Sequence, residues 1–411
     1  MKKRSFFRTS FSLFAALCLL SSCAAKGTPS GRSASLTEGL SVHDVAGKSA
    51  DKAFTDAQAA FSLSLLQQVV SDENVLVSPT SAMLALTMTA NGASGQTKTE
   101  METVLGQGVS LDDLNAYLNA VYVKGLLTDE TLHIADSVWI RSGLPVKEPF
   151  LQKNKDYLDA AVYESPFDQS TVNDINAWVK KSTNGMIEKL LDRISPDERM
   201  HLINAVAFEG EWVVPCDATA EGTFTSVSGE KQNAKMMSFT ETDYLSDENV
   251  TGFVKPYKDG KYAFAALLPN EGVSAKEYVL SLTPQKLSSL LSSSVPEQVA
   301  VTIPKFSYDY SVDLCDAMKA LGMPSAFADS ADFSAMSDKE DLYIGAINHV
   351  THIQVDENGT RAAAVTDVAM LCKALPAPPL HSVVLDRPFV YMILDTETNL
   401  PLFIGTLNTL E

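Results

Sequence analysis

The chain beyond residue 53 alternates irregularly between helical and strand-like hydrophobic patterns. One early segment repeats its apolar side chains at helical spacing, at Phe61, Leu65, Leu66 and Val69. The same spacing predicts helices at positions 174–191 (DINAWVKKSTNGMIEKLL) and 274–291 (SAKEYVLSLTPQKLSSLL). Strands are predicted for TLHIADSVWI, LINAVAFEGEW, KYAFAALLP and AVTIPKFSYDY, at positions 131–140, 202–212, 261–269 and 300–310.

The segment 78–92 reads SPTSAMLALTMTANG and predicts a helix buried in the core. Ser78 is a favourable N-cap, and Pro79 follows at the first helical position. Gly92 stands just past the expected end of this helix. Because apolar residues surround the helix axis on nearly all sides, we expect it to be covered by other elements.

Two apolar runs near the C-terminus, 385–394 and 400–407, flank the polar stretch 395–399 and predict a β-hairpin with a longer loop. No internal repeat and no second linker interrupts the pattern. The sequence therefore predicts one large domain of α+β type from residue 53 to residue 411.

The first residues are expected to be a targeting segment and not part of the folded domain. Basic residues precede an apolar run at 11–20 that is too short to anchor the chain across a bilayer, so we interpret 1–22 as a signal peptide. Positions 20–23 read LSSC, which resembles the bacterial lipoprotein box and would make Cys23 the lipidated first residue. An ordinary signal peptide is the alternative. Residues 23–52, rich in Ser, Gly and Ala, are expected to form a flexible tether.

The amino-acid composition argues against several classes of function. With 411 residues, 45% of them hydrophobic, the chain can bury a substantial core, and its formal net charge is −19. This charge argues against binding nucleic acid, and it leaves the lipid anchor as the expected membrane contact. Beyond Cys23, the widely spaced Cys216, Cys315 and Cys372 form no CxxC pair, so we expect free thiols, no metal and no cofactor.

Enzyme signatures are absent from the sequence. It contains no HExxH, Walker loop, GxGxxG or GxSxG, and its six histidines lack ligand spacing. The pattern SxxK occurs at 49–52 and 228–231, but neither match comes with a KTG partner. We therefore expect a protein that is not an enzyme.

Seven blocks follow one another along the chain beyond the expected tether: NVLVSPTSAMLALTMTANGASGQT, INAWVKKSTNGMIEKLL, LINAVAFEGEWVVP, FVKPYKDGKYAFAALLP, ALGMPSAFADSADFSAMS, NHVTHIQVDENGTRAAA and DRPFVYMILDTETNLPLFIGTL. In this order they resemble the blocks of the serpin family, and the resemblance covers nearly everything beyond the expected tether. It implies a central β-sheet with surrounding helices, an exposed reactive-centre loop and a monomer that traps proteases. Serpin loop insertion is a known example of strand addition and of strain released by cleavage.

The resemblance assigns the hinge of the loop to Glu357, Gly359, Thr360, Ala362, Ala363 and Ala364. An inserted strand places alternate residues on opposite faces, and in one register Thr360, Ala362 and Ala364 point inward. The ionisable Arg361 and Asp367 then point outward, so small side chains face the core where insertion begins. A helix over 361–371 is the competing interpretation from propensity alone.

Family spacing places the scissile bond between Lys373 and Ala374, and a lysine suits the acidic specificity pocket of trypsin-like serine proteases. The segment 374–388 is longer than usual in the family, so cleavage at Leu371, Cys372 or Ala374 by elastase- or subtilisin-like enzymes stays an alternative. The resemblance also implies a polar latch of Ser78, Ser81, Asn176 and His349, and Trp212 where the strand enters. A serpin that binds ligands or acts like a chaperone without inhibiting proteases is the rival function.

Overall fold

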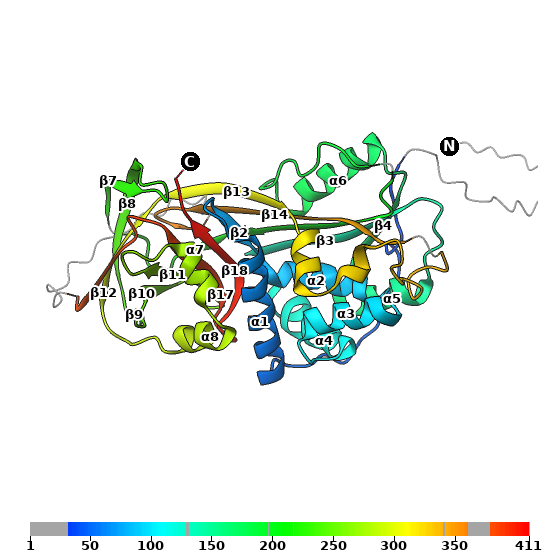
Figure 1. Ribbon diagram of the computed structural model, residues 1–411, viewed down its shortest axis with the longest axis horizontal. Coiled ribbons are helices and arrows are strands. Elements are labelled where there is room, and N and C mark those ends of the chain that lie inside the picture. Colours follow the sequence, from blue (N-terminus) through cyan, green and yellow to red (C-terminus); the bar gives the residue numbers. More distant parts are fainter. Residues whose placement is uncertain are drawn as a thin grey trace, which may run out of the picture. The chain divides into compact units, whose positions relative to one another are not determined.

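Three β-sheets and the helices packed on them make up the described part of the chain (Figure 1). The computed structural model describes residues 32–128, 131–195, 197–216, 218–339, 342–360 and 379–410. The α+β architecture and the single large domain predicted from the sequence are confirmed. Within the described ranges, none of the helices is long and apolar enough to cross a bilayer.

The largest sheet has eight strands, and we call it the large sheet. Its order is β1 (Ala34–Ser35), β4 (Ala161–Ser165), β3 (Leu132–Arg141), β5 (Met200–Phe208), β14 (Ile344–Val355), β15 (Gly359–Thr360) and β6 (Gly210–Glu211), and β13 (Phe306–Asp313) also pairs with β14.

The other two sheets of the described residues have six and four strands. The six-stranded sheet has the order β2 (Val75–Val77), β18 (Leu400–Leu407), β17 (Phe389–Asp395), β11 (Tyr262–Pro269), β10 (Val250–Pro256) and β9 (Asp243–Ser246). The four-stranded sheet has the order β16 (His381–Val384), β12 (Val299–Pro304), β8 (Lys231–Glu241) and β7 (Ala218–Thr225).

Helices cover both faces of the large sheet (Figure 1). The helices of the described residues are α1 (Lys52–Val69), α2 (Pro79–Ala90), α3 (Gly95–Gly106), α4 (Leu111–Leu118), the π-helix η1 (Asn119–Leu126), α5 (Glu148–Leu158), α6 (Gln169–Ser182), α7 (Ala275–Ser281), α8 (Pro284–Ser292), α9 (Cys315–Leu321) and the 3-10 helix η2 (Pro324–Phe327). α7 and α8 pack on the six-stranded sheet instead. α6 packs on one face through Val172, Ile175 and Val179, whereas α2 lies against the opposite face. We call these the outer and the inner face.

The predicted buried helix is confirmed. The hydroxyl of Ser78 accepts a hydrogen bond from the backbone N–H of Ser81, Pro79 is the first helical residue, and every residue from Pro79 to Ala90 is buried. The helix is covered because it lies between the large sheet and β18. The predicted C-terminal hairpin is also confirmed as β17 and β18.

Several predicted elements are interrupted in the structure. The helix expected at 274–291 is divided because Leu282 is extended and Thr283 caps a second helix that begins at Pro284. The helix expected at 174–191 ends at Ser182, since Asn184 and Gly185 adopt positive φ angles. Each of the strands expected at 202–212 and 300–310 is divided into two, β5 and β6 in the first and β12 and β13 in the second.

Residues 32–51 are not the flexible tether that the sequence predicted. β1 pairs with the edge strand β4, and the N–H of Leu36 donates to the carbonyl of Val162 at 2.8 Å. Further along, the N–H of Lys48 donates to the carbonyl of Ala116 at 3.0 Å. A segment of small residues without hydrophobic periodicity can still be held in place through its backbone hydrogen bonds when the edge of a sheet is available. The signal peptide, Cys23 and the start of the tether lie outside the described residues.

Candidate functional site

The site is built around the contact between β5 and β14, which we call the seam. These strands pair in parallel from Met200 and Ile344 to Ala207 and His352. β3 adds to β5 on one side, and β13 adds to β14 on the other. A further strand could enter here only by breaking the hydrogen bonds of the seam.

The described hinge residues lie at the β15 end of the seam. Gly359 and Thr360 pair with β6, and Thr360 also pairs with Val355 of β14. Thr360 is 0% exposed, and its hydroxyl lies 2.5 Å from that of Tyr257. This burial agrees with the inward position that the predicted register gives Thr360. The first loop residues are therefore already held in the large sheet.

The carboxylate of Glu357 is tied to the body beside the hinge. Lys305 Nζ lies 2.6 Å from Glu357 Oε2, and the hydroxyl of Thr219 donates to Oε1 at 3.3 Å. Partial burial is the largest single influence on Glu357 and opposes its ionisation. The hydrogen bonds from Lys305, Thr219 and the backbone, together with the charge of Lys305, outweigh burial and hold the pKa of this carboxyl below its usual value. Both side chains of this pair are about one-third exposed, so the pair contributes little stability.

Trp212 forms hydrogen bonds with the backbone beside the hinge. Its backbone N–H donates to the carbonyl of Asn358 at 2.8 Å, and its indole N–H donates to the carbonyl of Asp356 at 3.0 Å. The indole ring stacks on Tyr257 with ring centres 4.5 Å apart. The structure thus places Trp212 beside the point where the loop joins the sheet, as the resemblance implied.

A buried lysine beside Trp212 was missed from the sequence. Lys255 is 2% exposed, and its Nζ lies 2.6 Å from Glu241 Oε1 and 3.0 Å from the carbonyl oxygen of Val214. The ammonium also lies 4.1 Å from the ring centre of Phe239 and 5.4 Å from that of Trp212. A lysine within the apolar strand FVKP is the signal that could have revealed it.

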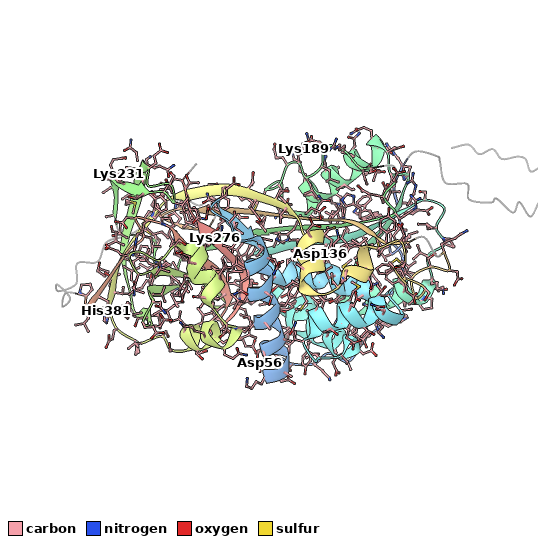
Figure 2. The ribbon with its side chains drawn as sticks, viewed as in Figure 1. Asp56, Asp136, Lys189, Lys231, Lys276 and His381 are labelled. Atoms are coloured by element: carbon pink, nitrogen blue, oxygen red, sulfur yellow. The ribbon has the colours of Figure 1, made fainter. Side chains whose placement is uncertain are left out.

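A hydrogen-bond network crosses the seam on the inner face, and we call it the inner latch. It consists of Ser78, Ser81, Asp136, Asn204 and His349. The N–H of Ser78 donates to His349 Nε2 at 3.0 Å, and His349 Nδ1 donates to Asn204 Oδ1 across the seam. The amide nitrogen of Asn204 and the hydroxyl of Ser81 both donate to Asp136 Oδ1. Asp136 lies where β3 passes α2 (Figure 2).

The geometry of the inner latch fixes the protonation of its histidine. Since Nε2 of His349 accepts a hydrogen bond, the ring carries its proton on Nδ1 and is neutral. Burial lowers the pKa of His349 to about 3. Burial also raises the pKa of Asp136 well above its usual value, although Ser81 and Asn204 donate hydrogen bonds to it. A neutral histidine and a carboxyl with a raised pKa thus lie on the two sides of Asn204.

The structure does not bring Asn176 into this network, and we correct that assignment. Asn176 lies on α6, where its Oδ1 accepts from the N–H groups of Leu190 and Leu191 at 2.8 and 2.9 Å. It fixes the chain that follows α6. Asn204 of β5 holds the latch position instead, because alternate residues of β5 face α2. An asparagine inside the apolar run LINAVAF was the available signal for Asn204, and Asp136 in β3 gave a similar one.

Ala362, Ala363 and Ala364 of the hinge, and the predicted reactive bond Lys373–Ala374, lie outside the described residues. In the ranges that the structure describes, no cluster of His, Cys, Asp and Glu has an arrangement suited to a metal ion.

Comparison with known proteins identifies the family. A family model described as Serpin (serine protease inhibitor) matches residues 56–410. Iripin-2 from Ixodes ricinus is 30% identical over 373 residues, covering 87% of this chain and 93% of Iripin-2.

Solved structures of the thermophilic serpin Tengpin are 42% identical to this chain. The native state has a TM-score of 0.88 and covers 92% of this chain and 100% of Tengpin. The latent state has a TM-score of 0.78, with coverages of 89% and 100%. The arrangement of the described residues is therefore more similar to the native state. The chain belongs to the serpin family of serine protease inhibitors and has the serpin fold.

Proposed function

We propose that this protein is an irreversible suicide-substrate inhibitor of a trypsin-like serine protease. The protease serine attacks the carbonyl carbon of Lys373, the amine of Ala374 leaves, and an acyl-enzyme forms. The released loop then enters the seam as an added strand and carries the attached protease along. The observation that supports this proposal most strongly is the closed seam with the buried Thr360 held at its end.

The expected energetics favour insertion. A strand of about 14 residues gains on the order of ten backbone hydrogen bonds, each contributing about 0.5–1.5 kcal/mol net. It spans roughly 46 Å at about 3.3 Å per residue, so the acyl-enzyme would be moved across the large sheet. Misplacement of catalytic groups by about 1 Å can slow a reaction about a hundredfold, which would stall deacylation.

Incubation with trypsin tests this function. We expect a covalent adduct that survives boiling in detergent, and mass analysis of the released C-terminal peptide should begin at Ala374. We also expect the cleaved protein to melt at a higher temperature than the intact protein. Turnover of the loop without an adduct, together with an unchanged melting temperature, would favour the non-inhibitory alternative.

We further propose that the protein is exported and anchored to a membrane as a bacterial lipoprotein. The LSSC motif at 20–23 and the preceding apolar run support this proposal. Replacement of Cys23 by Ser should release the protein from the membrane fraction, and mass analysis of the mature N-terminus should find an acylated Cys23 in the unmodified sequence. An unacylated N-terminus in the unmodified protein would contradict the anchor.

A further inference from the structure

A second polar pair crosses the seam on the outer face. On β5, His201 and Asn204 point to opposite sides of the sheet, and on β14 Asn348 and His349 do the same. His201 Nε2 is hydrogen-bonded to Asn348 Oδ1. The outer pair therefore repeats the inner His–Asn contact with the strands exchanged: here the histidine is on β5 and the asparagine is on β14.

The surroundings of the His201 ring differ from those of His349. Both ring nitrogens of His201 face oxygen atoms, because Nδ1 lies 3.2 Å from Glu198 Oε2. These two atoms are buried, and among the described residues neither forms a hydrogen bond, with the other atom included, so their contact is one of ion-pair distance. Only the imidazolium form carries a proton on each nitrogen, so it alone can serve both Asn348 and Glu198. His349 instead accepts a hydrogen bond from Ser78 and stays neutral.

Glu198 is the acidic residue within ion-pair distance of His201 among the described residues. His201 is 3% exposed and lies opposite Trp139 of β3 and Ala346 of β14. α6 contributes apolar side chains to this face. Arg141 at the end of β3 donates to the backbone carbonyl of Glu198, and Arg199 follows Glu198 in sequence. On the inner face, the titratable groups are Asp136 and His349.

Gly345 of β14 leaves space for the side chain of Glu198. A Cβ atom at Gly345 of β14 would lie 2.9 Å from Cγ of Glu198, closer than ordinary contact. The glycine thus lets Glu198 lie against β14 while it faces a histidine on β5. Glu198, His201 and Asn348 consequently connect the two strands that an inserted loop must separate.

We propose that His201 is an outer latch: as an imidazolium it joins Asn348 to Glu198, so the seam opens more readily when His201 loses its proton. This inference rests on the proposed insertion mechanism for its biological meaning, but it concerns the intact sheet. It assigns His201 as a positioning residue that acts on the strands and does not touch the protease.

Amide hydrogen exchange of the intact full chain tests the outer latch without any protease. Protection factors, corrected for the intrinsic effect of pH, are measured at about pH 5 and about pH 9, on either side of the ordinary histidine pKa. For amides at 200–207 and 344–352 we expect protection about tenfold lower at the higher pH, since a hydrogen bond to a charged group is lost. Amides of β17 and β18 serve as the internal control and should not change.

Three variants separate a proton-dependent latch from simple packing. His201→Gln keeps a donor toward Asn348 but cannot titrate, so its seam protection should not vary with pH. Glu198→Gln should reduce the pH effect, and Asn348→Ala should lower protection at both pH values. Asp136→Asn removes one of the two titratable groups of the inner face and should leave the pH effect in place.

The outcomes distinguish this inference from the proposed function. A pH effect in His201→Gln equal to that of the unmodified protein, or no pH effect in the unmodified protein, would overturn the outer latch even if trypsin adducts form. The expected exchange profile combined with clean turnover by trypsin would support the latch and refute the inhibitor function.

Discussion

Asn204 on β5 and His349 on β14 face each other in register, and a direct hydrogen bond joins their side chains across the seam. If the inserted strand continues in the register of Gly359 and Thr360, Thr366 would come between them. The hydrogen bond between Asn204 and His349 would then break, and both side chains would contact the inserted loop instead.

We expect acid to destabilise the intact protein through His349. Its pKa is about 3 in the fold against an ordinary 6.5, so the unfolded chain takes up a proton first as the pH falls. The stability that the neutral ring provides is present above about pH 6.5 and is lost as the pH falls toward about 3. A tenfold difference in proton affinity between the folded and unfolded chain corresponds to about 1.4 kcal/mol, so this effect should amount to a few kcal/mol.

Denaturant unfolding of the intact protein between about pH 7 and pH 4 measures this effect. His349→Gln should be less stable at neutral pH and should show a weaker dependence on pH over the same range. Equal slopes in the variant and the unmodified protein would assign the acid sensitivity to other groups. Asp136 acts in the opposite direction, because its raised pKa favours the fold at low pH.

Lys255→Met should destabilise the protein strongly. The substitution removes the Lys255 ammonium from its contact with the largely buried Glu241, and breaking one side of a buried pair costs about 3–5 kcal/mol. The fluorescence of Trp212 should change as well, because Lys255 lies over its ring.

The double variant Lys255→Met with Glu241→Gln provides the control. It removes both charges, and we expect it to recover at least half of the lost stability in the same denaturant experiment. A double variant as unstable as the single one would show that packing of the lysine stem, rather than the charge, is what Lys255 contributes.

Thr360→Arg should convert the proposed inhibitor into a substrate. Thr360 is buried against Tyr257, and a long charged side chain has no room at that inward position. We expect trypsin to cleave the loop with little adduct formation, measured as the moles of inhibitor consumed per mole of trypsin inactivated. Arg361→Ala, at the neighbouring outward position, is the matched control and should keep its stoichiometry. Retained inhibition by Thr360→Arg would contradict the register.

Gly359→Ala should expel the hinge from the large sheet. A Cβ atom there would lie 2.0 Å from the carbonyl oxygen of Gly210, which is backbone and cannot move aside cheaply. We expect loss of about 1–3 kcal/mol of stability and faster exchange of the amides at 359 and 360. Gly106→Ala is the control, since its added Cβ would meet only Val109 at 3.8 Å. Similar effects of both substitutions would argue against a specific close approach at Gly359.

Local signals in the sequence predicted α2 and the C-terminal hairpin. The cap of α2 is formed by Ser78, Pro79 and Ser81, which lie within one helical turn of each other, so the sequence contains all its partners. The hairpin strands β17 and β18 are likewise neighbours in the sequence, since β17 ends at Asp395 and β18 begins at Leu400. Family resemblance added Trp212, Ser78, Ser81 and His349; the structure places Trp212 beside the hinge and the other three in the inner latch.

The sequence by itself determined the class of fold, the buried helix, the hinge composition and the family, because these depend on neighbouring residues or on ordered blocks. Only the tertiary structure decided that Asn204 and Asp136, rather than Asn176, complete the inner latch, and that residues 32–51 are bound. Those contacts join α2, β3, β5 and β14, or a backbone edge of β4, across long stretches of chain. Their hydrogen bonds depend on which strands become neighbours, and local sequence does not specify this.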